Sequence, residues 1–122
     1  MSPTQFEAVA RRAVESLPAE FKPYLADCIL LVEPRATPEQ LRTLELAEDE
    51  DLFGLYEGSA LTERQVGDPP ELPPRITLFY EPLMDACASD DELIHEIQVT
   101  ILHEIGHHFG LDEERLEELG FG

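Results

Sequence analysis

The sequence contains very little positive charge. It has 8 Lys and Arg residues against 27 Asp and Glu residues, a formal net charge of −19 over 122 residues, and Lys22 is its only lysine. A surface of this sign repels phosphate groups, so nucleic acids and anionic membranes are excluded as partners. The excess of carboxylates favours solubility and attracts cations, but it does not identify a function.

Cysteines and long apolar runs are also scarce. Cys28 and Cys87 are the only cysteines, and they lie far apart. A secreted disulfide scaffold would carry more of them, so two buried free thiols in a reducing compartment are expected. The longest apolar stretch, residues 28–32, is too short to cross a bilayer, and the N-terminal segment has no signal-peptide run. These absences favour a cytoplasmic protein.

What the sequence does contain predicts one α+β domain over residues 1–122. Three capping boxes, each a Ser or Thr followed three residues later by Gln or Glu, predict helix starts at Ser2, Thr37 and Ser89. The expected helices run to Pro18, to about Leu46 and to about Phe109, and a short last helix covers residues 113–119. Apolar runs at 28–33, 52–56 and 75–80 predict a small mixed sheet of about three strands, and residues 58–74 predict an exposed loop.

The helix expected from Ser89 carries the motif HEIGH at residues 103–107. At 100° per residue its apolar side chains share one face, while His103 and His107 lie one turn apart on the other, below Thr100. Two imidazoles at this spacing supply two corners of a tetrahedral zinc site, at about 2.0–2.1 Å. Glu104 points away from that pair but can reach a zinc-bound water, for which it would act as general base.

A catalytic zinc needs a third protein ligand, and the residues after the motif offer two. Gly110 can adopt the left-handed conformation and turn the chain back toward the metal. The position three residues past the glycine is Glu113, and its neighbour Asp112 is also acidic. Asp is among the best helix N-caps, so Asp112 is expected to cap the last helix, which leaves Glu113 for the zinc. Asp112 stays the alternative ligand.

The sequence resembles the small bacterial zincin-like metallopeptidases, the minimal zincins with an HExxHxxG core. The resemblance rests on four blocks in order: FEAVARRAVESLPAEF, LFGLYEGSALTER, PRITLFYEPL and TILHEIGHHFGLDEERLEEL. It implies a zincin-like fold, zinc bound by His103 and His107, and a catalytic Glu104. Family members usually carry Asp at the third-ligand position, where this chain has Glu113.

Two functions follow from this pattern. The first is a zinc metallopeptidase that hydrolyses a peptide or protein substrate. The second is a zincin-fold metal-binding or interaction protein with little or no hydrolytic activity, favoured by the absence of a methionine turn after the zinc helix. A zinc amidase acting on a small substrate is a weaker third. Zincins hold a substrate along an edge strand; Arg75–Tyr80 is either that strand or an interior strand without a substrate role.

Overall fold

A computed structural model describes residues 2–26, 28–43, 52–57 and 74–121, and the side chains at 43 and 107–109 lie outside this description. The predicted end of the second helix at Leu46 and residues 58–73 of the loop predicted at 58–74 also lie outside it. Among the described residues, no helix is both long enough and apolar enough to cross a membrane.

The elements confirm an α+β fold. In chain order they are α1 (Pro3–Glu15), the 3-10 helix η1 (Ala19–Tyr24), β1 (Ile29–Glu33), α2 (Pro38–Thr43), β2 (Gly54–Glu57), β3 (Arg75–Phe79), α3 (Tyr80–Ala86), α4 (Asp90–Phe109) and α5 (Glu113–Glu118). Four helices and three strands match the predicted segments. The helices η1 and α3 were not predicted.

Side-chain caps explain where the predicted helices begin. The Ser2 hydroxyl accepts from Gln5 N at 3.2 Å, and Gln5 Oε1 accepts from Ser2 N at 2.8 Å, which completes a capping box. The same reciprocal pair joins Thr37 and Gln40 at 3.1 and 2.9 Å. At the start of α4 the Ser89 hydroxyl accepts from the third amide of the helix at 3.2 Å. Each cap satisfies main-chain donors that a helix start leaves unpaired.

The unpredicted α3 begins where the third strand was expected to continue. The strand ends at Phe79 and the helix starts at Tyr80, so Pro82 lies in its first turn. Proline is tolerated there because the amide it lacks has no partner inside the helix. The strand predicted at 75–80 is therefore one residue too long, and Pro82 belongs to the start of a helix.

The sheet has the order β1-β3-β2. β1 runs parallel to β3, with Leu30 opposite Ile76, and β2 runs antiparallel to β3, with Gly54 opposite Leu78. β3 is therefore the central strand and pairs on both sides. This settles the two alternatives for Arg75–Tyr80 in favour of the interior strand and, within the described part of the chain, leaves β1 and β2 as the edges.

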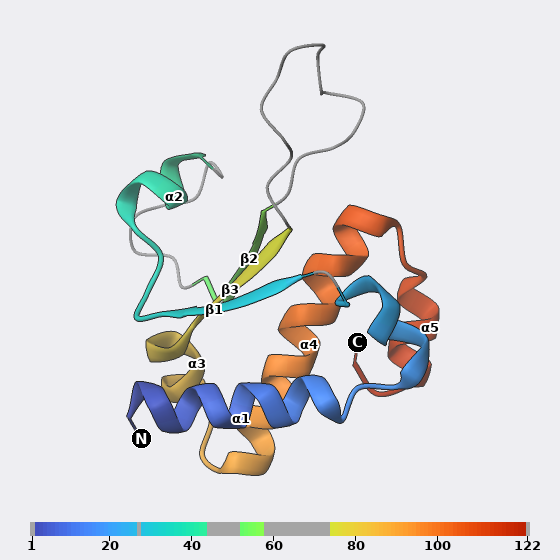
Figure 1. Ribbon diagram of the computed structural model, residues 1–122, viewed down its shortest axis with the longest axis horizontal. Coiled ribbons are helices and arrows are strands. Elements are labelled where there is room, and N and C mark those ends of the chain that lie inside the picture. The colour runs from blue at the N-terminus through green and yellow to red at the C-terminus, as the bar shows by residue number, and fades with distance from the viewer. Residues whose placement is uncertain (1, 27, 44–51, 58–73, 122) are drawn as a thin grey trace.

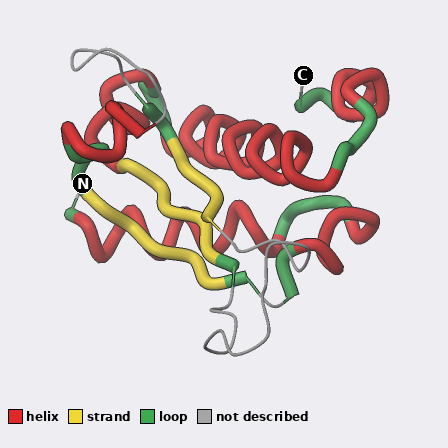
Figure 2. Tube along the Cα trace, turned by 90° about the horizontal axis from the view of Figure 1, so that it is seen from above, coloured by secondary structure: helices red, strands yellow, loops and turns green. Residues whose placement is uncertain are grey.

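Helices α1 and α4 cover the sheet face that carries Ile76 and Leu78, and these two helices share one hydrophobic core with β3. Figure 1 shows the two helices crossing, and Figure 2 shows the strands lying together with both helices running past them. The predicted apolar face of α4 is confirmed by its buried residues Leu93, Ile97, Ile101, Leu102 and Ile105. Gln98 Nε2 ties the helices together by donating to the Ala13 carbonyl at 2.9 Å.

An ion pair links α5 to η1. Arg115 on α5 pairs with Glu20 on η1 at 3.0 Å, and these two helices lie side by side in Figure 1.

Cys28 and Cys87 are both free, as predicted, but only half-buried. Burial raises the pKa of each thiol, and the carboxylates of Glu96 and Glu92 raise that of Cys87 further.

Candidate metal and catalytic site

The site is built at the C-terminal end of α4. Gly110 ends the helix with φ 67° and ψ 39°, in the left-handed region that favours glycine. The Gly106 carbonyl accepts from Gly110 N at 2.8 Å and from Leu111 N at 3.2 Å, so the chain folds back over its own last turn. The glycine turn predicted from the sequence is therefore present.

Asp112 caps α5, as predicted. Its Oδ1 accepts from Glu114 N at 2.9 Å, which commits this carboxylate to the helix start. Glu113 is the first residue of α5 and its side chain is exposed. The two acids thus have different roles: Asp112 caps the backbone of α5, and the side chain of Glu113 is exposed.

Glu113 and His103 line the same small cavity. It has a volume of about 40 Å³, and Gly106, Leu111 and Leu116 form the rest of its wall. The two residues come from different helices and line one cavity because the turn at Gly110 brings α5 back to the end of α4. The His103 side chain is exposed on the helix surface, on the side where the sequence pattern placed it.

His107 lies in α4 one turn after His103, but its side chain is outside the described part of the structure. Among the side chains that are described, no group of three or more His, Cys, Asp or Glu residues could hold a metal. The donor chemistry of His103, Glu113 and a second imidazole at position 107 fits zinc, which binds nitrogen and carboxylate ligands in catalytic sites. The assignment of His103, His107 and Glu113 as metal ligands stays a prediction.

Glu104 reaches the edge strand β2. Its Oε2 accepts from the main-chain N–H of Tyr56 at 3.4 Å, and its side chain is half-buried. Since β2 is an edge strand, the donor is an amide that does not pair with β3. The amide of Phe79 donates to the Phe53 carbonyl at 3.0 Å, so the alternation of an antiparallel pair turns the amides of Gly54 and Tyr56 away from β3.

The helical periodicity predicts one face of α4 as polar, but only part of that face is exposed to solvent. Thr100 is only 8% exposed, because β2 packs against it, whereas His103 is exposed. This face is therefore exposed at His103, where the pattern placed the histidines, and buried at Thr100. A short edge strand covers it, and the periodicity of one helix carries no information about such a neighbour.

Tyr56 brings a side chain as well as an amide to this region. Burial raises the pKa of its phenol, and the neighbouring Cys28 raises it further, so the hydroxyl stays protonated at neutral pH. The sequence alone does not single out Tyr56 among the tyrosines. Its hydrogen bond to Glu104 is made by the backbone, which leaves no residue-type signal in the sequence.

A mixed sheet beside a helix that carries HExxH, followed by a glycine turn and a carboxylate, is the architecture of a minimal zincin. Residues 25–122 match the family of zincin-like metallopeptidases, and the chain belongs to that family.

A conserved hypothetical protein from T. thermophilus has a similar structure, with a TM-score of 0.54 and 22% identity over 89% of this chain and 94% of that one. At that identity the likeness shows a shared fold. The sequence has no significant match among curated proteins.

Proposed function

We propose that the protein is a zinc-dependent metallopeptidase that hydrolyses peptide bonds. The observation that carries the proposal is the cavity shared by His103 and Glu113, beside a helix face from which Glu104 reaches the edge of the sheet. With His107, the first two residues form a ligand set of two imidazoles and one carboxylate, as in thermolysin-type zinc sites.

Each part of the chain has a separate task in this reaction. Zinc, when bound, supplies a Lewis acid that lowers the pKa of water toward about 7. Glu104 takes the proton from the attacking water and delivers it to the leaving amine. His103 and Glu113 hold their positions because one lies on the long helix and the other follows the Gly110 turn directly.

The substrate strand in this proposal is β2. An extended peptide adds to a sheet edge through main-chain hydrogen bonds. Among the strands that the structure describes, β3 pairs on both sides, whereas β2 is an edge and lies next to Glu104. The peptide-binding role that the sequence suggested for Arg75–Tyr80 therefore passes to Gly54–Glu57.

The direct test exchanges Glu104 for Gln and measures zinc content and hydrolysis of a quenched-fluorescent peptide library. Glu104→Gln keeps the shape of the side chain but cannot take a proton, so hydrolysis should fall by about 10²-fold or more. Zinc content should stay at about one per chain, because this residue is not a predicted ligand.

Glu117→Gln, an exposed substitution on α5, serves as the matched control and should leave both quantities unchanged. His103→Ala should lose the zinc. Hydrolysis that is absent from the zinc-loaded native protein, or equal in the native and Glu104→Gln proteins, would contradict the proposal and favour a metal-binding role without catalysis.

A further inference from the structure

Strand β2 and helix α4 are matched in spacing where they touch. Gly54 and Tyr56 lie two residues apart on the strand, about 6.6–6.8 Å. Thr100 and Glu104 lie four residues apart on the helix, about 6 Å. Gly54 packs on Thr100, and the Tyr56 amide donates to Glu104. The strand is thus seated on the helix at two successive points.

The first point depends on the absence of a side chain. A Cβ at Gly54 would lie 2.7 Å from Thr100 Cγ2 and 3.3 Å from the Thr77 carbonyl oxygen. The positive-φ glycines among the described residues are Gly110 and Gly120, so the conformation of Gly54 does not itself require glycine. Space requires it, because the strand approaches the helix too closely for any larger residue.

Thr100 cannot easily make room for a larger residue. It is β-branched, and its χ1 angle is restricted inside a helix. It is also buried under the strand, at 8% exposure. A methyl group added at Gly54 would therefore move the strand away from the helix instead of moving Thr100 alone.

The second point is sensitive to such a movement. The distance from Tyr56 N to Glu104 Oε2 is 3.4 Å, beyond the usual range of about 2.7–3.2 Å for N–H···O bonds. A further shift of a few tenths of an ångström would break the bond. The carboxylate would then lose a donor that is fixed in the backbone of a strand.

We propose that Gly54 is a positioning residue for the catalytic glutamate. Its bare backbone seats the edge strand on Thr100, at the height from which the Tyr56 amide holds the Glu104 carboxylate. This inference rests on the proposed function for its catalytic consequence, but the positioning itself is a structural statement about these residues. The glycine acts through Tyr56 and does not touch substrate.

The test compares Gly54→Ala in two backgrounds. In the native background it should lower kcat by about 10- to 100-fold, the size of effect that a displacement of about 1 Å can produce. In a Thr100→Ser background, where Cγ2 is absent, the same change should lower kcat by less than about threefold. Zinc affinity should stay within about twofold in all variants, since β2 supplies no predicted ligand. An equal loss of kcat in both backgrounds would overturn the proposal.

A second measurement works without any hydrolysis and with little risk to folding. Glu104→Gln in the otherwise native chain should change the chemical shift and hydrogen exchange of the Tyr56 amide. Gly54→Ala should remove this response, and Gly54→Ala with Thr100→Ser should restore it. A Tyr56 amide that ignores Glu104→Gln would overturn the positioning role, while a zinc-loaded protein that shows the response but cleaves no peptide would contradict only the proposed function.

Discussion

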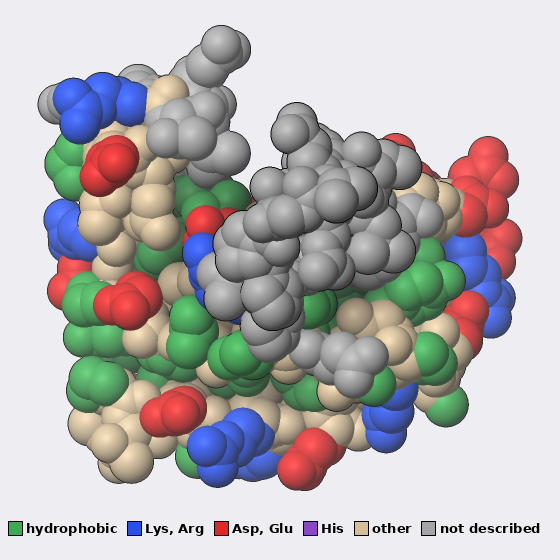
Figure 3. All heavy atoms as spheres, turned by 45° about the horizontal axis from the view of Figure 1, so that its top comes forward, with side chains coloured by type: hydrophobic (Ala, Val, Ile, Leu, Met, Phe, Trp, Pro, Cys, Tyr) green, Lys and Arg blue, Asp and Glu red, His purple; other side chains and the backbone are tan. Residues whose placement is uncertain are grey.

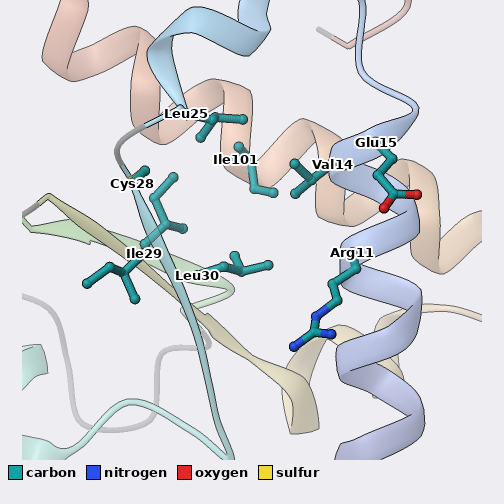
Figure 4. A pocket seen from close by; sticks show the side chains of 9 residues that line it. Arg11, Val14, Glu15, Leu25, Cys28, Ile29, Leu30 and Ile101 are labelled. Carbon is teal, nitrogen blue, oxygen red and sulfur yellow. The ribbon is translucent and has the colours of Figure 1, made fainter.

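The two edges of the sheet belong to the same three strands but have different surroundings. β2 lies against α4, and one of its outward amides pairs with a helix carboxylate. β1 has exposed apolar side chains instead, with Ile29 at 45% and Leu31 at 39% exposure. Below β1, Ile29 and Leu30 both line an apolar cavity of about 180 Å³, and Figure 4 shows their side chains on opposite sides of the strand.

The difference lies in what the neighbouring helix presents. Toward β1, α1 presents Val14, while Arg11 and Glu15 line the same cavity, and these side chains leave a gap in the packing. Toward β2, α4 presents a small buried threonine and a carboxylate. A helix can pair with the outward amides of an edge strand only when it approaches that strand closely, and at β2 a glycine makes this approach possible.

The difference between the two edges can be tested most directly by removing one outward amide from each edge strand. Tyr56→Pro deletes the amide that donates to Glu104 without touching the ladder to β3, and should lower kcat by about tenfold or more. On β1, Ile29 donates to the Pro74 carbonyl at 2.9 Å, so Val32, three residues on, directs its amide away from β3. Val32→Pro is the matched change, and peptide hydrolysis should survive it.

Tyr56→Ala separates the amide of Tyr56 from its ring. It keeps the N–H and should retain most of the kcat that Tyr56→Pro loses. If the alanine and proline variants lose activity equally, the ring matters and the amide does not. If Val32→Pro is as damaging as Tyr56→Pro, the two edges do not differ in the way described.

Substitutions in the segment that joins α4 to α5 can test which residue is the third zinc ligand. Glu113→Ala should weaken zinc affinity by at least about tenfold, since even losses outside the ligand shell cost 10- to 100-fold. Asp112→Ala should instead lower the free energy of unfolding by about 1 kcal/mol through loss of the N-cap, with zinc affinity nearly unchanged. Competition with a chromogenic chelator measures the affinities, and the opposite ranking would make Asp112 the ligand.

Much of the fold could be predicted because its signals are local. Ser2, Thr37 and Ser89 cap helices through side chains that lie within the same few residues, and Gly110 stops α4 through its own φ. Asp112 was assigned its cap by the same kind of reasoning. Such features depend on hydrogen bonds between near neighbours in the chain, so the residue types reveal them.

The contacts between β2 and α4 could not be predicted, because they join residues far apart in the chain through groups that every residue possesses. The amide of Tyr56 is a backbone donor, and Gly54 is conspicuous only once Thr100 is seen beneath it. The order of the strands in the sheet could not be predicted from the sequence either. Nothing in the run at 75–80 distinguishes a central strand from an edge, since burial on both faces depends on what packs there.

Metal removal should loosen the end of α4 and α5 more than it loosens β1. The core that α1, α4 and β3 share contains no predicted ligand, so the apo protein should still unfold cooperatively, with only part of its stability lost. Hydrogen exchange on chelation should rise most in α5 and the end of α4, and least in β1. An apo protein without a cooperative thermal transition would show that zinc holds the whole fold together.

The smallest expected effect concerns β1, where two neighbouring leucines face opposite ways. Leu31 is exposed and Leu30 lines the cavity, and Figure 3 shows hydrophobic side chains reaching the surface between charged ones. Leu31→Lys should change the free energy of unfolding by less than about 0.5 kcal/mol, because an exposed side chain loses little by becoming polar. Leu30→Lys, the matched change, should cost more than about 1 kcal/mol, because its ammonium group would enter an apolar space.

Chemical denaturation of the two variants decides this point, and peptide hydrolysis checks that neither change reaches the site. Leu31→Lys should leave kcat unchanged, since β1 is separated from Glu104 by β3 and β2. A stability loss equal to that of Leu30→Lys would mean that Leu31 is covered in solution and that β1 is not an open edge. The contrast between the edges would then rest on the Tyr56 amide alone.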